Sequence, residues 1–230
     1  CILCILRVLR VLCDFASSIF VLFQPQPCET MRDSLLRLTN FIDGDYRAPL
    51  SGAWLPVTEP ATGQVYAEVP DSGAADIDAA VAAAQRAQRD WAATAPSARA
   101  AMLRRIADLI ESQLDAFAEE ESRDNGKPLH VARSVDIPRA VTNFRFFASM
   151  AESFASESHA GEVGTLNYTL RQPLGIVGCI SPWNLPLYLL TWKIAPALAA
   201  GNCVIAKPSE ITPVTAWLLG EVVQQAGLPP

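Results

Sequence analysis

The spacing of apolar residues along the chain changes twice, and each change predicts a different kind of element. Residues 41–70 consist of short β-type segments that Gly, Pro and Asp turns separate. From about residue 76 to residue 154, apolar side chains recur every three or four positions, which predicts three amphipathic helices. Asp76 and Ser97 are placed to cap the first two helices, and Pro138 is expected in the first turn of the third.

The acidic sequence "EEESRDNGK", residues 119–127, joins the second predicted helix to the third. It combines charged side chains with Asn-Gly, a dipeptide that marks turns. We interpret it as a solvent-exposed helix end, because a run of charges is most often a solvated surface.

A period of two replaces the helical period at Thr165–Pro173, where Leu166, Tyr168 and Leu170 alternate with polar residues. This alternation predicts a strand with one buried face and one solvent-exposed face.

Two later segments, "GIVGCI" and "NCVIA", are apolar on both faces, and a helix-length apolar run that ends at Gly201 separates them. Doubly buried strands with a helix between them predict a parallel βαβ unit. A further helix follows, which Thr212 is expected to cap and Gly227 to end. The predicted fold class is therefore α/β, with a parallel sheet and helices N-terminal to it.

The first thirty residues differ from the rest. The segment "CILCILRVLRVLCDFASSIFVLF" is apolar, but Arg7, Arg10 and Asp14 interrupt it. A membrane-spanning helix needs about 20 apolar residues with few charges, and a signal peptide carries its charges before the apolar run. Neither pattern is clean, and the first Met is Met31. We interpret residues 1–30 as a translated upstream extension, with a membrane or targeting leader as the alternative.

Composition and charge narrow the classes of function. Half of the residues are apolar and 18% are charged, which is typical of a folded globular protein. The net charge of −6 disfavours a nucleic-acid partner, which requires a basic surface. The six cysteines are spaced neither as a disulfide framework nor as a zinc site, so no metal is expected and a reducing, cytoplasmic location is favoured. The two histidines, His130 and His159, are isolated and are expected at the surface.

Candidate chemistry gathers where the two buried strands end. In an open parallel sheet, ligands bind beyond the carboxyl ends of the strands. The first strand leads into "SPWN" (181–184) and the second into "KPSE" (207–210). No G-x-G-x-x-G sequence is present, so an ordinary dinucleotide fingerprint is absent. Two simpler interpretations stay open: Asn184 as the N-cap of the next helix, and Lys207 with Glu210 as an exposed ion pair in a turn.

The segment "SPWNLPLYLLTWKIAPALAAGNCVIAKPSEITPVTA" resembles the aldehyde dehydrogenase superfamily. The similarity extends from about Asn40 to the end and includes "VTEPATG" and "NGKP". "FIDGDY" and "DIPRAVTNFRFFA" are similar to the 2-aminomuconate and 2-hydroxymuconate semialdehyde dehydrogenase branch. Beyond the extension (1–30), the resemblance implies three parts: β segments and helices of an NAD-binding domain (31–162), an oligomerisation strand (163–173) and the first βαβα of a Rossmann-like domain (174–230).

The resemblance also implies roles for individual residues. Asn184 matches the asparagine whose amide stabilises an oxyanion. The nicotinamide end of NAD would be lined by Ile180, Ser181, Pro182 and Trp183, and its adenosine ribose would be bound by the turn that contains Lys207, Ser209 and Glu210. An acidic group at the ribose favours NAD over NADP. Arg139, or less favourably Arg145, is a candidate cation for a carboxylated substrate.

The family's nucleophilic cysteine and basic glutamate belong to the second half of a full-length member. Cys179 and Cys203 lie in apolar strands, where a thiol is unreactive, so neither is expected to replace the nucleophile. We therefore interpret the chain as an inactive N-terminal fragment of an NAD-dependent aldehyde dehydrogenase. Its parent would oxidise an aldehyde, such as a muconate-type semialdehyde, as a homodimer or homotetramer. The alternatives are a non-catalytic chain that pairs with full-length subunits, a truncated gene model, and an acyl-CoA-forming relative of the same fold.

A chain that starts at Met31 should be at least as soluble as the 230-residue chain, because the composition of residues 1–30 breaks with that of the remainder. The soluble yield of the two chains, expressed side by side, measures this. A loss of soluble protein on deletion would show that these residues pack into the folded domain.

Overall fold

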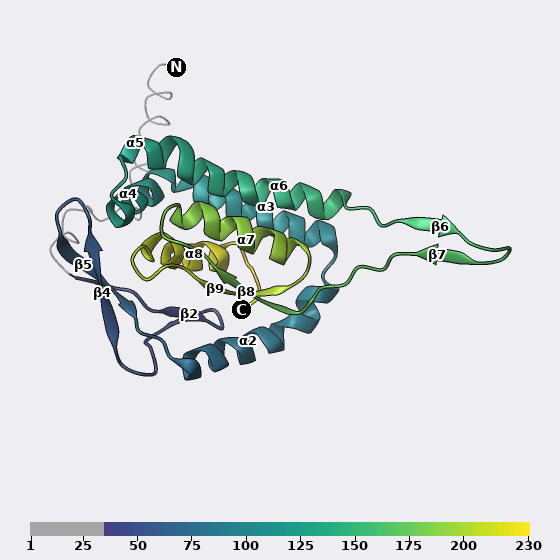
Figure 1. Ribbon diagram of the computed structural model, residues 1–230, viewed down its shortest axis with the longest axis horizontal. Coiled ribbons are helices and arrows are strands. Elements are labelled where there is room, and N and C mark those ends of the chain that lie inside the picture. Colours follow the sequence, from purple (N-terminus) through teal and green to yellow (C-terminus); the bar gives the residue numbers. More distant parts are fainter. Residues whose placement is uncertain (1–34) are drawn as a thin grey trace, which may run out of the picture. The chain divides into compact units, whose positions relative to one another are not determined.

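The computed structural model describes residues 35–230, so the extension predicted over residues 1–30 lies outside the described residues. The N-terminal region is built from short strands, as predicted for residues 41–70 (Figure 1). A hairpin pairs β2 (Asn40–Ile42) with β3 (Asp45–Arg47). A second, three-stranded sheet has the order β1-β5-β4. Its strands are β1 (Leu36–Arg37), β4 (Trp54–Glu59) and β5 (Gln64–Pro70).

The helical region contains the predicted amphipathic helices, but the second one is divided. The helices are α2 (Ala74–Ala93), α3 (Pro96–Ser112), α4 (Leu114–Asn125), the short α5 (Leu129–Val131) and α6 (Ile137–Ser153). A π-helical turn, η3 (Ala132–Asp136), leads into α6. The predicted apolar stripe is buried at Leu103, Ile106, Ile110 and Phe117, which form part of the main core. Helix α3 ends and α4 begins at Gln113, within the stripe.

The predicted N-caps at Asp76, Ser97 and Thr212 are wrong by one to three positions. Asp76 lies in the first turn of α2, and its carboxylate accepts the N–H of Gly73 at 3.0 Å and that of Leu50 at 2.9 Å. A side chain can therefore satisfy a free amide at a helix start without occupying the capping position itself. The observed N-caps are Gly73 for α2, Ala95 for α3 and Pro213 for α8 (Val214–Gln225).

The predicted parallel βαβ unit is confirmed. Strand β8 (Ile176–Ile180) pairs in parallel with β9 (Cys203–Lys207), and α7 (Pro186–Ala199) connects them. The expectation that both strands are completely buried is wrong: among the residues of β8 and β9 only Cys179 is buried, and Ile180 at the end of β8 is 70% exposed. Within residues 35–230, β8 and β9 pair only with each other, so part of this small sheet remains uncovered.

The strand predicted at 165–173 forms one half of a hairpin. Strand β7 (Leu166–Tyr168) pairs antiparallel with β6 (Ser158–Ala160), beyond the C-terminal end of α6 (Figure 1). All residues of both strands are exposed, so the predicted buried face is absent from the described chain. The reason is that no other element of residues 35–230 covers either face, although Leu166 and Tyr168 are large and apolar. Its interpretation as an oligomerisation strand stays a prediction.

The acidic end of α4 is buried, which contradicts its interpretation as a solvated helix end. Glu121 is 0% exposed and Asp124 is 1% exposed. Glu121 accepts the hydroxyl of Thr215 at 2.8 Å. Asp124 accepts the hydroxyl of Tyr66 at 2.7 Å and the backbone N–H of Val214 at 2.9 Å. The two carboxylates thus connect α4 to the first turn of α8 and to β5.

Lys127 supplies the positive charge for this cluster. Its ammonium group pairs with Asp136 and lies 3.6 Å from Glu121 Oε1, and its side chain is only 10% exposed. Burial raises the pKa of Glu121, while Lys127 and Thr215 oppose the shift. Burial also raises the pKa of Asp124 to about 7, against the two hydrogen bonds that it accepts. Removal of water is therefore the dominant electrostatic effect at both carboxyl groups.

Lys127→Met should lower the free energy of unfolding by about 3–5 kcal/mol, because it leaves Glu121 and Asp136 buried without their counter-charge. Urea denaturation measures the change. Asp115→Asn is the matched control, since it breaks the exposed Arg133–Asp115 pair of 2.9 Å and should cost at most about 1 kcal/mol. Equal losses in the two variants would contradict the prediction.

Asp124→Asn should alter how stability depends on pH. The folded-state pKa of Asp124, about 7, lies above its ordinary value of 3.8. The folded protein therefore binds a proton on Asp124 more tightly than the unfolded protein does. The stabilisation is complete below about pH 4 and is lost as the pH rises to about 7. The free energy of unfolding, relative to that of Asp124→Asn, should therefore fall across this range. A difference that stays flat across this range would refute the prediction.

Candidate active site

The two segments that were predicted to carry the chemistry lie at the same edge of the small sheet. They are called here the first corner (residues 181–184) and the second corner (residues 207–210). The backbone N–H of Ser181 donates to the carbonyl of Lys207 at 3.1 Å, directly after the paired residues Ile180 and Lys207. Ser181 is buried, whereas Pro182, Trp183 and Asn184 are exposed beyond it. The structure therefore brings together the residues that follow β8 and β9, as predicted from the sequence.

Asn184 does not cap the helix that follows it. Helix α7 begins at Pro186, its N-cap is Leu185, and no side chain makes a capping hydrogen bond there. The side chain of Asn184 is exposed and makes no hydrogen bond within residues 35–230. Its amide N–H groups are consequently available to a ligand at the carboxyl end of β8.

The second corner carries an exposed ion pair. Lys207 Nζ lies 2.8 Å from Glu210 Oε2, and both side chains are more than half exposed. The hydrogen bond from Lys207 is the largest cause that lowers the pKa of Glu210, so the carboxylate is charged at neutral pH. Between them, the carbonyl of Ser209 accepts the N–H of Thr212 at 3.3 Å, which closes a turn. The open interpretation as a turn ion pair thus describes the observed contact, and both charges still face solvent.

The two cysteines of the described chain are unsuited to nucleophilic attack. Cys179 is buried in β8, and Cys203 is half-buried at the start of β9. Burial raises the pKa of both thiols, which disfavours the reactive thiolate.

The candidate substrate cations differ in their surroundings. Arg139 is exposed in the first turn of α6, immediately after η3. Arg145 pairs with Asp108 at 2.8 Å and with Glu111 at 2.6 Å, so its charge is already balanced. Arg139 is therefore the better placed of the two for an added carboxylate. His130 and His159 are both exposed, as expected.

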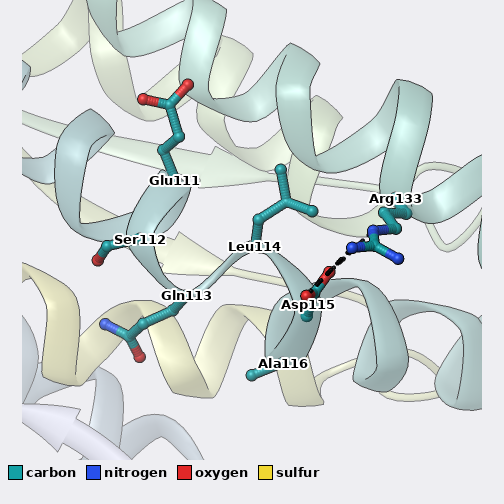
Figure 2. A pocket seen from close by; sticks show the side chains of 7 residues that line it. All are labelled: Glu111, Ser112, Gln113, Leu114, Asp115, Ala116 and Arg133. Carbon is teal, nitrogen blue, oxygen red and sulfur yellow. Dashed lines mark hydrogen bonds and ion pairs between the residues drawn. The ribbon is translucent and has the colours of Figure 1, made fainter.

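A hollow of about 440 Å³ lies elsewhere, at the break between α3 and α4. Figure 2 shows Arg133 and Asp115 paired at its edge. None of the predicted site residues lines it, and its walls carry two acidic groups, Glu111 and Asp115, beside the one arginine. Within residues 35–230, no group of three or more His, Cys, Asp or Glu side chains could hold a metal ion.

Sequence reasoning missed three residues of α4 that contact the segments following β8 and β9, namely Glu121, Asp124 and Asn125. The side-chain amide of Asn125 donates to the carbonyl of Trp183 at 2.8 Å. A signal for the carboxylates was present, because the buried position Phe117 is followed by Glu121 and Asp124 at helical spacings of four and three. No signal in the sequence singles out Asn125.

Comparisons with known proteins agree with this architecture. The model of the aldehyde dehydrogenase family matches residues 47–230. The chain is 53% identical over 199 residues to 2-aminomuconic semialdehyde dehydrogenase of Homo sapiens, covering 86% of the chain and 40% of that relative. It is 46% identical to 2-hydroxymuconic semialdehyde dehydrogenase of Pseudomonas sp. strain CF600, covering 84% of the chain and 40% of that relative. The chain thus spans about two fifths of the length of these relatives.

Known structures show the same fold. A structure of PnpE in complex with nicotinamide adenine dinucleotide matches with a TM-score of 0.81 and 38% identity, over 84% of the chain and 39% of PnpE. PnpE comes from Pseudomonas sp. WBC-3. A variant of an aldehyde dehydrogenase from Bacillus cereus matches with a TM-score of 0.83 and 35% identity, over 90% of the chain and 42% of that structure.

The predicted α/β fold and the predicted muconate-semialdehyde resemblance are both confirmed. No helix among residues 35–230 is long and apolar enough to cross a membrane. Because the family model matches residues 47–230, which is most of the chain, the chain belongs to the aldehyde dehydrogenase family.

Proposed function

We propose that this chain contributes the oxyanion donor and part of the NAD site to an enzyme that oxidises an aldehyde to a carboxylate. The observation that carries the proposal is the exposed amide of Asn184, without a partner in residues 35–230, at the edge where Lys207 and Glu210 also lie. The overall reaction consumes the aldehyde, water and NAD⁺ and yields the carboxylate, NADH and two protons.

Asn184 would act on the aldehyde oxygen. When a nucleophile attacks the carbonyl carbon, negative charge develops on that oxygen, and a positioned amide N–H stabilises it. The side chain is neutral, so it stabilises the charge without changing its own protonation. Cys179 and Cys203 are not the nucleophile in this proposal, because burial raises the pKa of both thiols. We therefore expect the chain to be inactive by itself.

The residues at the edge fit a dinucleotide. Bound NAD would supply the acceptor for the hydride that leaves the aldehyde carbon. The exposed apolar surfaces of Ile180 and Trp183 suit the flat nicotinamide ring, and Ser181 and Pro182 separate them in the sequence. The charged carboxylate of Glu210 and the ammonium of Lys207 suit ribose hydroxyl groups, with Ser209 in the turn between them. A carboxylate there would repel a 2′-phosphate, which favours NAD over NADP.

The substrate would be a small aldehyde that also carries a carboxylate. The support is Arg139, whose exposed guanidinium can bind a carboxylate with two hydrogen bonds. The names of two relatives, the 2-aminomuconic and 2-hydroxymuconic semialdehyde dehydrogenases, support the same substrate class. We further propose a cytoplasmic homodimer or homotetramer in which the hairpin of β6 and β7 is covered, because its exposed Leu166 and Tyr168 are apolar.

Asn184→Asp in the complete enzyme tests the proposal. A carboxylate would repel the developing oxyanion, so kcat should fall by about 10²–10³ while the KM for NAD and the melting temperature stay unchanged. Steady-state assays of NADH absorbance measure both constants. Gln85→Glu, the same change of amide to carboxylate on the exposed face of α2, is the control and should keep kcat. A near-native kcat in Asn184→Asp would rule out the oxyanion role.

A further inference from the structure

Asn125, the last residue of α4, contacts the corner that carries Asn184. Its Nδ2 donates to the carbonyl oxygen of Trp183 at 2.8 Å, across 58 positions of sequence. The carbonyl of Trp183 and the backbone N–H of Asn184 belong to one planar peptide group. A hydrogen bond that orients this carbonyl therefore also orients the backbone from which the Asn184 side chain extends.

Few other hydrogen bonds hold this corner. On one side, the N–H of Ser181 donates to Lys207, and on the other the N–H of Leu189 donates to Leu185 at 2.9 Å. Between them, the bond from Asn125 is the one hydrogen bond to the backbone of residues 182–184 within the described chain. Pro182 and Pro186 stiffen the segment, but a proline ring restricts only its own φ and biases the residue before it. The peptide between Trp183 and Asn184 thus depends on α4 for its orientation.

The end of α4 is itself firmly anchored. Gly126 adopts the left-handed conformation, with φ +79°, and its N–H donates to Ser122 at 2.9 Å. The Ser122 hydroxyl donates to the carbonyl of Lys127 at 2.7 Å. The buried Asp124 is held by Tyr66 and by the first residue of α8. Neighbouring residues of one helical turn therefore contact the segments that follow both strands: Asp124 the start of α8, and Asn125 the residues after β8.

We propose that Asn125 is a positioning residue, whose amide fixes the Trp183–Asn184 peptide so that the Asn184 side chain is held at the reacting oxygen. This inference rests on the proposed function, because it concerns the residue that donates to the oxyanion. An electrostatic donor acts fully only when it is already in place, and a shift of about 1 Å can cost about 10²-fold in rate. A donor is required at position 125, because the group that it contacts is a carbonyl oxygen.

The first experiment measures the corner without any assay of activity. The chain contains five tryptophans, so incorporation of 5-fluorotryptophan gives a ¹⁹F spectrum in which Trp183→Phe identifies the resonance of Trp183. Asn125→Ala removes the donor without adding charge, and it should shift or broaden this resonance. Glu119→Gln, an exposed change on the same helix, should leave it in place. A Trp183 resonance that is unchanged in Asn125→Ala would overturn the proposal.

The second experiment is a double-mutant cycle on kcat in the complete enzyme, with Asn125→Ala and Asn184→Ala. Asn125→Ala should lower kcat by about ten- to a hundredfold when Asn184 is present. When Asn184 is already alanine, the same change should cost less than about twofold, because it acts through that side chain. The kcat of Asn125→Asp should be no higher than that of Asn125→Ala, because a carboxylate oxygen would then face the carbonyl oxygen of Trp183.

The outcomes separate the two claims. Equal losses from Asn125→Ala in both backgrounds would mean that Asn125 only supports the fold, and the positioning role would be wrong. The same conclusion follows when Asn184→Ala is slow but Asn125→Ala keeps its kcat. A near-native kcat in Asn184→Ala would instead refute the oxyanion role, and with it any catalytic effect of Asn125, even where the Trp183 resonance moves.

Discussion

The structure depends on a set of buried charges at the end of α4. Glu121 and Asp124 are excluded from water, and Lys127 and Asp136 complete the cluster. Carboxylates buried in this way are costly unless charges and hydrogen bonds compensate for the loss of solvation. The counter-charge Lys127 is close in sequence, but the hydrogen-bond partners come from distant parts of the chain, so the cluster forms only when α4, η3, β5 and α8 are assembled together.

The position of the carboxylates explains why this arrangement serves the site. Helix N-termini leave amide groups without partners and carry partial positive charge. Asp124 accepts the N–H of Val214 at the start of α8, and the backbone N–H of Leu187 in the first turn of α7 opposes the rise in the pKa of Glu121. Both helices follow directly from the strands that end at the candidate active site. Helix α4 thereby contacts the first turn of each helix that follows the two strands.

The chemistry divides in a similar way. In our proposal, the exposed side chain of Asn184 binds the substrate oxygen, and those of Lys207 and Glu210 bind NAD. The two thiols of the described chain instead lie within the strands of the sheet. Polar groups beyond a rigid sheet edge are held more accurately than groups on a free loop. The contact of Asn125 with Trp183 extends this rigidity to the corner itself.

The sequence alone determined the elements whose signals are local. The parallel pair β8 and β9, the turn at Gly201 and the gathering of "SPWN" and "KPSE" at one edge follow from runs of apolar residues and from short motifs. Only the tertiary structure decided whether polar groups are buried, which side chains satisfy helix ends, and that both faces of β7 are exposed. The partners of Glu121, Asp124 and Asn125 lie 94, 90 and 58 positions away, so local periodicity carries no information about them. Burial of a charge is a property of the assembled surroundings, and that is why an acidic helix end that is expected in water instead has two carboxylates buried against β5 and α8.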